Sequence, residues 1–435
     1  MERLVIDGGR PLGGTIPISG AKNSALALLA GALLASEPCT LHNVPRLADV
    51  HVMSEVLASL GVRIAMGADG TVRVDAGTLT DYTTPYHLVT QMRASFFVLG
   101  PILARLGQAR IPLPGGCAIG SRPVDLHLKG LRSLGAKVTI EHGFVEASAD
   151  RLVGAPVYLD YPSVGATETI MMAAALADGT TTIDNCAQEP EIADLAPFLA
   201  AMGARVEGAG TEQITVHGRS RLGGAEHRVI PDRIEAGTFL IAGAITGGDL
   251  TLSGIRPEHL VALIGKLQEM GAIITAPDGD VLRIQAPERL KAADVRTMPF
   301  PGFPTDLQAQ IMALLAVAEG TSVISETVFE NRFLHVDELL RMGANIKTEG
   351  NVAVVQGVDS LSGAEVRATD LRAGAALVLA GLAARGHTLI SGVHHIDRGY
   401  EDLERKLIGV GASISRSRVE GQASDPVAQA PGLTR

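Results

Sequence analysis

The chain repeats one short phrase six times, Leu-x-x-apolar-Gly-Ala/Val-x-Ile/Val, and this repeat constrains the fold more than any other feature. Its six glycines lie 68 to 74 residues apart and are Gly61, Gly135, Gly203, Gly271, Gly343 and Gly411. Self-similarity at a nearly fixed period indicates a chain built from copies of one supersecondary unit. Six copies divide evenly into two sets of three, and 435 residues exceed one ordinary core, so we expect two domains.

Each copy of the phrase follows a segment with the apolar spacing of an amphipathic helix. In the first copy Val50, Met53, Val56, Leu57 and Leu60 fall on one face of a 3.6-residue period. The glycine comes where that helix must end, a position that favours left-handed backbone and therefore Gly. The β-branched residue three positions later indicates the start of a strand.

A second, Ala-rich helical segment precedes each amphipathic one, for example at 24–35, 166–177 and 373–384. Short β-like runs, such as Thr180 to Ile183, lie between the two helices. Alternating helices and strands predict an α/β fold, with the Ala-rich helix buried and the patterned helix facing solvent.

Composition excludes several classes of function. A net charge of −10 and a pI of about 5.7 argue against a nucleic-acid surface. An odd number of cysteines, Cys39, Cys117 and Cys186, is not a disulfide framework and favours a reducing compartment. No signal peptide opens the sequence, and no apolar run approaches the ~20 residues that span a bilayer. We therefore expect a cytoplasmic protein without membrane contact, with a disordered tail at 420–435.

One insertion distinguishes the second copy from the others. It is the glycine-rich stretch from Leu113 to Pro123, which contains Cys117 between small residues and then Arg122. Loops carry a large share of binding and catalytic groups, and a nearby cation lowers the pKa of a thiol. Cys117 is therefore a candidate reactive group, with an inert loop cysteine as the alternative.

Cationic residues recur at matched distances before the repeat glycines. Those at 11–13 residues and at 39–42 residues before a glycine are Arg122, Arg332 and Arg398, and Lys22, Arg93 and Arg372. Each is expected at or before a helix start, where backbone N–H groups and the helix dipole favour anions. Arginine adds bidentate recognition of carboxylate or phosphate. Convergence of these positions would give a multi-anion site; taken singly, each could be an ordinary solvated side chain.

Two further segments are candidates for chemistry. Asp306 ends the run Pro301–Asp306 before an Ala-rich helix, and could be a general base if a hydroxyl lies about 3 Å away, or a helix cap. Residues 160–165 offer backbone amides ahead of another helix, for a phosphate or only a turn. The sequence contains no nucleotide-loop, zinc or serine-hydrolase motif, and we expect no metal.

Several segments together resemble the enolpyruvyl transferases, and among them the UDP-N-acetylglucosamine 1-carboxyvinyltransferases. They match in order from Met1 to about Ile414 and include Gly20–Ser24, Leu113–Asp125, Ser163–Thr167, Pro301–Asp306, Phe329–Phe333 and Asp397–Tyr400. The resemblance implies an α/β protein of two domains, each a threefold repeat of βαβαββ units with helices packed inside sheets. One domain would be residues 22–230, and the other residues 1–21 plus 231–419. Two crossings would form a hinge that closes on substrate and excludes water.

The resemblance also implies a reaction. The enolpyruvyl group of phosphoenolpyruvate would pass to the 3′-hydroxyl of UDP-N-acetylglucosamine with release of phosphate, the first committed step of peptidoglycan precursor synthesis. The family proceeds by addition and elimination through a tetrahedral intermediate, without metal or another cofactor. Both partners of the protein would thus be anionic small molecules.

The family's functional residues match positions of this chain. Cys117 matches the proton donor to the phosphoenolpyruvate methylene, and Asp306 the base at the sugar hydroxyl. The cations around phosphate and carboxylate match Lys22, Arg122, Arg332, Arg372 and Arg398. Substrate contacts match Asn23, Arg93, Arg122, Pro123, Val124, Asp125, Leu126, Ser163, Val164, Gly165 and Val328, and Asp370 matches an acid near the reacting centre with an open role.

One departure and two alternatives accompany the resemblance. Pro162 stands where some members carry Lys or another residue, which leaves the diphosphate contact open. The cysteine, where some members have Asp, implies sensitivity to fosfomycin. The shikimate-pathway enolpyruvyl transferase shares the sixfold architecture but lacks the Pro-Gly-Gly-Cys loop. A non-catalytic paralogue that binds a UDP-sugar is the other alternative, although every acid, base and cation position is filled here.

Overall fold

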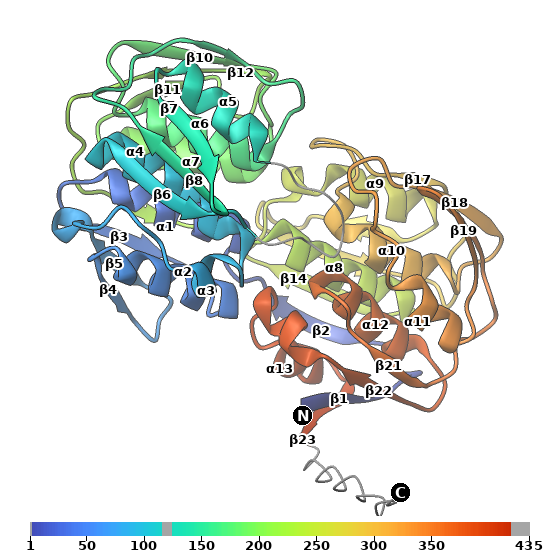
Figure 1. The fold of residues 1–435 in the computed structure, drawn as a ribbon. Helices are drawn as coiled ribbons and strands as arrows, with labels where there is room; N and C mark the ends of the chain where they lie inside the picture. Colours follow the sequence, from blue (N-terminus) through green and yellow to red (C-terminus); the bar gives the residue numbers. More distant parts are fainter. Residues whose placement is uncertain (1, 115–123, 419–435) are drawn as a thin grey trace, which may run out of the picture.

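The computed structural model describes residues 2–114 and 124–418, drawn in Figure 1. The candidates Cys117, Arg122 and Pro123 and the expected tail at 420–435 lie outside the described residues. Buried apolar side chains form two separate clusters. We call residues 21–230, which surround one cluster, the first body, and residues 2–18 and 234–414, which surround the other, the second body. The predicted domain limits stay a prediction, and we propose that these two cores are those of the two domains.

The first body contains these elements: helices α1 (Lys22–Gly31), α2 (Ala48–Ser59), α3 (Tyr86–Val89), α4 (Leu99–Leu106), α5 (Asp125–Ser133), α6 (Val164–Ala174) and α7 (Pro190–Ala201), the 3-10 helices η1 (Ala32–Leu34), η2 (Ala76–Thr78) and η3 (Arg93–Val98), and strands β3 (Cys39–His42), β4 (Arg63–Met66), β5 (Val72–Asp75), β6 (Gln108–Pro112), β7 (Lys137–Glu141), β8 (Phe144–Ser148), β9 (Pro156–Tyr158), β10 (Thr180–Asp184), β11 (Arg205–Glu207), β12 (Gln213–His217) and β13 (Glu226–Arg228).

The second body contains these elements: strands β1 (Glu2–Asp7), β2 (Gly13–Pro17), β14 (Asp249–Ser253), β15 (Ile273–Thr275), β16 (Val281–Gln285), β17 (Val295–Arg296), β18 (Thr321–Ser325), β19 (Asn345–Glu349), β20 (Val352–Gln356), β21 (Glu365–Arg367), β22 (His387–Ser391) and β23 (Ser413–Arg418), helices α8 (Arg233–Ile245), α9 (Val261–Glu269), α10 (Gln308–Leu315), α11 (Val336–Arg341), α12 (Leu371–Ala383) and α13 (Leu403–Gly409), and the 3-10 helices η4 (Pro257–His259), η5 (Thr305–Leu307) and η6 (Val393–Arg398).

The strands form six small sheets, one for each copy of the repeat. The sheet β11-β12-β10-β9 is typical: β9 and β10 are parallel, whereas β12 is antiparallel to both of its neighbours. In the sheet β6-β8-β7 the parallel outer strand is reduced to a single bridge between Thr83 and Arg110. The predicted repeating α/β unit is confirmed.

The beginning of the chain completes the second body. Strand β2 pairs in parallel with β14, and β1 lies between β22 and β23, antiparallel to both. Strand β13 reaches back in the same way to pair with β3 in the first body. The chain therefore starts in the second body, builds the first and returns.

The six repeat glycines all have the backbone that the sequence predicts. Their φ angles lie between +88° at Gly343 and +112° at Gly203, a region that costs glycine little and other residues much. In all six units a strand begins two residues after the glycine, as β4 does after Gly61. The glycine is thus the turn from the amphipathic helix into the sheet.

The Ala-rich helices lie inside the sheets, as expected. In the second body α8, α10 and α12 contact one another and are almost wholly buried, and Figure 1 shows the strands outside them. Small side chains allow these helices to approach closely, and the amphipathic helices bury one face only, as α9 does with Leu263 and Leu267. Among the described helices, none is both long and apolar enough to cross a membrane.

Candidate active site

The two crossings between the bodies bring the start of α1 next to the start of α8. The backbone N–H of Ala21 donates to the carbonyl of Ile230 at 2.7 Å, and that of Asp232 to Ser19 at 2.9 Å. One carboxylate oxygen of Asp232 accepts from Ile234 and Glu235 and so caps α8, and the other accepts from the N–H of Lys22 at 3.0 Å. Asp232 therefore joins the N-termini of one helix from each body.

Asp306 lies in η5, directly before α10, between two guanidiniums. Arg332 donates to its Oδ1 at 2.7 Å and Arg372 to its Oδ2 at 2.9 Å, and both arginine side chains are nearly buried. Burial alone would raise the pKa of Asp306, but Arg372, Arg332 and Lys22 hold it well below its ordinary value. The carboxylate binds the arginines and does not cap α10, whose N-cap residue is Leu307.

The side chain of Arg372 is held by a buried polar cluster. Its Nη1 donates to the hydroxyl of Tyr400 at 3.3 Å, and this hydroxyl also meets Thr238 at 2.9 Å and Gln310 at 3.2 Å. Asp370 contributes differently: its Oδ1 accepts from the N–H groups of Arg372 and Ala373 and caps α12. The structure thus gives Asp370, whose role the sequence left open, a structural contact.

Lys22 and Arg398 share a second carboxylate. Asp49, at the start of α2, accepts from Lys22 Nζ at 3.2 Å and from Arg398 Nε at 2.8 Å, and its side chain is 5% exposed. Burial lowers the pKa of Lys22; Asp49 and Asp306 oppose this effect, and the guanidiniums of Arg372 and Arg398 add to it. The charges around both carboxylates, those of Asp49 and Asp306, therefore act on the pKa of Lys22. These cations and carboxylates form one cluster, in which the cations outnumber the two carboxylates.

The remaining predicted residues of the first body gather at the starts of η3, α5 and α6. Gly165 lies so close to its neighbours that an added Cβ would be 3.0 Å from Phe97 and 3.1 Å from the imidazole of His127. Burial and the charge of Arg93, which begins η3, lower the pKa of His127 to about 3. The hydroxyl of Ser163 caps α6 at 3.4 Å. Val124 is the N-cap residue of α5, Asp125 and Leu126 lie in its first turn, and Val164 opens α6.

Glu326 links the segment that contains Val328 to Thr305, the residue directly before Asp306. Its Oε1 accepts from the N–H groups of Val328 and Phe329, and its Oε2 from the hydroxyl of Thr305 at 2.9 Å. Asn23, the remaining candidate, is the second residue of α1, beside Lys22.

Sequence reasoning did not assign roles to three residues that the structure brings into the site: Asp49, His127 and Tyr400. A signal for Asp49 was present, since it lies 12 residues before Gly61, within the same interval as Arg332 and Arg398 before their own glycines. Tyr400 ends the segment Asp397–Tyr400 that carries the family resemblance, whereas no comparable signal marked His127. The contacts of both residues depend on packing between units.

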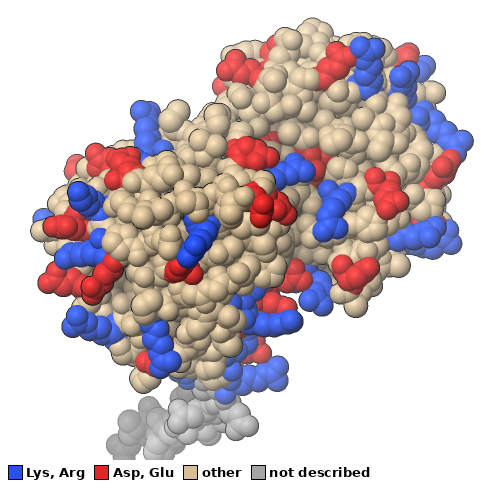
Figure 2. Space-filling view, turned by 180° about the vertical axis from the view of Figure 1, so that it is seen from behind, with Lys and Arg blue, Asp and Glu red and all other residues tan. Residues whose placement is uncertain are grey.

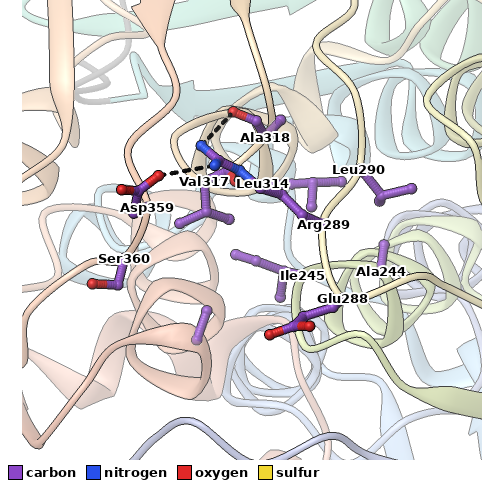
Figure 3. A pocket seen from close by; sticks show the side chains of 11 residues that line it. Ala244, Ile245, Glu288, Arg289, Leu290, Leu314, Val317, Ala318, Asp359 and Ser360 are labelled. Atoms are coloured by element: carbon purple, nitrogen blue, oxygen red, sulfur yellow. Dashed lines mark hydrogen bonds and ion pairs between the residues drawn. The ribbon is translucent and has the colours of Figure 1, made fainter.

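The surface outside this cluster has no single sign of charge on the face seen in Figure 2, where Lys and Arg alternate with Asp and Glu. A hollow of about 400 Å³ lies at the far ends of α8, α10 and α12, away from their starts at the cluster. Figure 3 shows Arg289 there, turned toward Asp359 at 2.9 Å and the carbonyl of Ala318. Arg289 therefore satisfies carbonyls at the end of α10, and the cluster of cations remains the candidate site.

Comparisons with known proteins identify the family of this chain. The sequence model of the EPSP synthase family (3-phosphoshikimate 1-carboxyvinyltransferase) matches residues 6–407. The chain is 58% identical over 431 residues to the UDP-N-acetylglucosamine 1-carboxyvinyltransferase of Gloeobacter violaceus, covering 98% of this chain and 94% of that one. It is also 56% identical to UDP-N-acetylglucosamine 1-carboxyvinyltransferase 1 of Caldanaerobacter subterraneus, covering 95% and 99%.

Solved structures share the fold. The enolpyruvyl transferase NikO from Streptomyces tendae superposes with a TM-score of 0.86 at 30% identity, covering 96% of this chain and 99% of that one. An EPSP synthase from Acinetobacter baumannii superposes with a TM-score of 0.75 at 21% identity, covering 96% and 100%. At that identity the second likeness concerns the fold alone.

Proposed function

The chain belongs to the family of the UDP-N-acetylglucosamine 1-carboxyvinyltransferases, and we propose on this premise that its cation cluster transfers an enolpyruvyl group. The group passes from phosphoenolpyruvate to the 3′-hydroxyl of UDP-N-acetylglucosamine, and phosphate is released. This step begins the synthesis of peptidoglycan precursors. The observation that carries the assignment to this site is the meeting of Lys22, Arg332, Arg372 and Arg398 around Asp306 and Asp49.

We propose the following sequence of bonds. The sugar 3′-oxygen adds to C2 of phosphoenolpyruvate while its proton passes to Asp306, and C3 receives a proton from the thiol of Cys117. A proton then passes from C3 of the tetrahedral intermediate back to the thiolate of Cys117 as the C2–O bond to phosphate breaks, which restores the double bond and releases phosphate. Preorganised cations stabilise the charge that develops on the phosphate and carboxylate, usually the largest single contribution to catalysis.

The arrangement around Asp306 suggests how it becomes a base. While both guanidiniums donate to it, its pKa is held low and it accepts protons poorly. A substrate phosphate or carboxylate competes for Arg332 and Arg372. Each hydrogen bond that the substrate takes over removes a cause of the low pKa, so Asp306 becomes more basic only when the anionic substrate is bound.

We propose that the first body holds the UDP-sugar. Arg93, the first turn of α5 and the Ser163–Gly165 start of α6 converge there, and neutral His127 lies beside Gly165. The sequence resemblance adds Arg122, Pro123 and Asn23 to this set. We propose a cytoplasmic location, which the free thiols of Cys39 and Cys186 support, since such thiols are typical of a reducing compartment.

The test is phosphate release from phosphoenolpyruvate with UDP-N-acetylglucosamine as the acceptor. Shikimate 3-phosphate serves as the control acceptor, which distinguishes the shikimate-pathway activity of the same fold. We expect release with the UDP-sugar alone. Absence of release with either acceptor would instead favour a non-catalytic UDP-sugar-binding protein.

Fosfomycin tests the role of Cys117 separately. Burial raises the pKa of Cys39 and raises that of Cys186 to about 11, so both thiols are protonated at neutral pH and poorly reactive. Covalent labelling should therefore occur at Cys117 only, and Cys117→Ser should abolish it and lower turnover sharply. Cys186→Ser is the matched control and should label like the unaltered chain. Peptide mass spectrometry that finds the label on Cys39 or Cys186 would contradict the assignment.

A further inference from the structure

The carboxylate of Asp49 binds one cation from each of the two bodies. Its Oδ2 accepts from Lys22 of the first body and its Oδ1 from Arg398 of the second, at 3.2 Å and 2.8 Å. Both oxygens of a buried carboxylate are thus used by cations of the site. Within the described residues the terminal nitrogens of Arg398 donate no hydrogen bond, and its side chain is 37% exposed. Arg398 is therefore held through Nε, and its two terminal guanidinium nitrogens are positioned to bind an anion.

The segments that meet at Asp49 have complementary charges. Residues 46–49 of the first body present Arg46 and Asp49, and residues 398–402 of the second present Arg398, Glu401 and Asp402. Arg46 Nε lies 2.9 Å from Glu401 and its Nη2 3.7 Å from Asp402. This outer pair differs from the inner one in exposure, since the side chain of Arg46 is 53% exposed and that of Asp49 only 5%.

We propose that Asp49 is a positioning residue of the enolpyruvyl transfer, which fixes Lys22 and Arg398 against each other so that phosphoenolpyruvate meets both cations only where the two bodies touch. The inference rests on the proposed function of the cation cluster. Asp49 itself touches no substrate in this scheme, because both of its oxygens are occupied by the cations it orients.

An acid in the first turn of a helix also interacts favourably with the helix dipole, which is the alternative explanation of Asp49. The two explanations differ in what they predict. A dipole contribution changes the stability of α2 and is independent of Arg398. A positioning role changes the use of phosphoenolpyruvate and requires Arg398.

The central experiment compares Asp49→Asn, Arg398→Ala and the double variant in the phosphate-release assay. We expect Asp49→Asn to lower kcat/KM for phosphoenolpyruvate about 100-fold, the usual cost of a misplaced catalytic group. Its dissociation constant for UDP-N-acetylglucosamine should stay within about 3-fold, a change of no more than ~0.7 kcal/mol. Because Asp49 acts partly through Arg398, the loss in the double variant should be clearly smaller than the product of the two single losses. Asp49→Glu, which keeps the carboxylate, should recover at least about 10-fold of the loss.

Arg46→Ala is the matched control. It removes an ion pair between the same two segments without touching Lys22 or Arg398. Because exposed pairs contribute little, kcat/KM should change less than about 3-fold. Multiplying losses in the double variant, a loss in Arg46→Ala equal to that in Asp49→Asn, or an unchanged Asp49→Asn would each overturn the proposal.

A second measurement separates this proposal from the proposed function. Lys22 should react faster with an amine-specific acylating reagent in Asp49→Asn than in the unaltered chain, because its Nζ loses its partner, while Arg46→Ala should leave the rate unchanged. Mass spectrometry of the Lys22 peptide reads this without turnover. If the unaltered chain releases no phosphate, the proposed function fails, and an unchanged Lys22 labelling rate would independently reject the role of Asp49.

Discussion

The buried helices of the two bodies start differently at the cluster. In the first body they begin with Lys22, with Arg93 and after Ser163, and none has an acidic residue in its first turn. In the second body each start carries an aspartate: Asp232 before α8, Asp306 in η5 before α10, and Asp370 before α12. The first body thus places no carboxylate of its own at these helix starts, whereas the second body places one at each.

We propose that, because of this difference, the two bodies recognise the two anionic substrates in different ways. The second body uses Asp232 and Asp370 as caps, so its N–H groups are largely satisfied, and it must recognise anions with arginine side chains. Of these three aspartates, only Asp306 does not cap its helix. Its carboxylate binds Arg332 and Arg372 instead. Of the three aspartates, the one that does not cap is therefore our candidate for proton transfer, once a substrate competes for its arginines.

The largest effect should come from that exceptional aspartate. Asp306→Ala is expected to lower kcat about 1000-fold, within the range for loss of a general base, and to change the dissociation constant for the UDP-sugar only a few-fold. Steady-state kinetics and calorimetry measure the two quantities. Asp359→Ala, an exposed acid at the far end of the same body, should leave both unchanged. A pure affinity effect in Asp306→Ala would make it a binding residue and remove the distinction among the three aspartates.

The cations of the two bodies should differ in their response to pH. Burial lowers the pKa of Lys22, and a lysine is charged only below its pKa, so kcat/KM for phosphoenolpyruvate should fall as pH rises, beginning below 10.5. The fall should be about 10-fold per pH unit. Arginines do not titrate in this range, so Lys22→Arg should move the alkaline limb upward. An alkaline limb that stays in place would assign it to another group.

A smaller effect is expected at the first body's helix starts. Ser163→Ala removes a hydroxyl that caps α6 and should weaken UDP-sugar binding roughly 10-fold, the upper range for one hydrogen bond, with little change in KM for phosphoenolpyruvate. Ser54→Ala is the control, since that hydroxyl bonds within α2, to Val50, away from any helix start. Equal effects on both substrates would show that the two bodies do not divide the recognition as we propose.

The smallest effect should be on stability. Asp370→Ala removes the cap of α12 and is expected to lower the free energy of unfolding by about 1 kcal/mol, whereas Asp370→Asn, which also caps, should lose only a few tenths. Denaturant titration measures both. A large loss in the Asn variant would mean that the charge of Asp370 matters more than its hydrogen bonds to Arg372 and Ala373.

The sequence predicted the features that are local or periodic. A glycine with positive φ between a helix and a strand, as at Gly61 or Gly411, appears at the same place in every copy of the repeat. The Ala-rich helices are recognisable from their composition. Arg332, Arg372 and Arg398 were found because their distances to the glycines match.

The contacts that give those residues their roles could not be predicted. Asp49 and Arg398 are 349 positions apart, and Arg372 meets Asp306 across 66. Such contacts arise only when three units pack around buried helices and the two bodies meet. The sequence left Asp306 as either a cap or a base, and only the position of two guanidiniums shows that it does not cap.

The placement of β1 between β22 and β23 has a consequence for synthesis. Strand β1 is made before every other described strand, yet it is an inner strand of a sheet whose other members are made after all the other described strands. At about 5–20 residues per second, roughly 20 to 80 seconds separate them. The first body can complete its core during this interval, while β1 still lacks its partner strands β22 and β23. Assembly of this sheet therefore depends on the synthesis of β22 and β23.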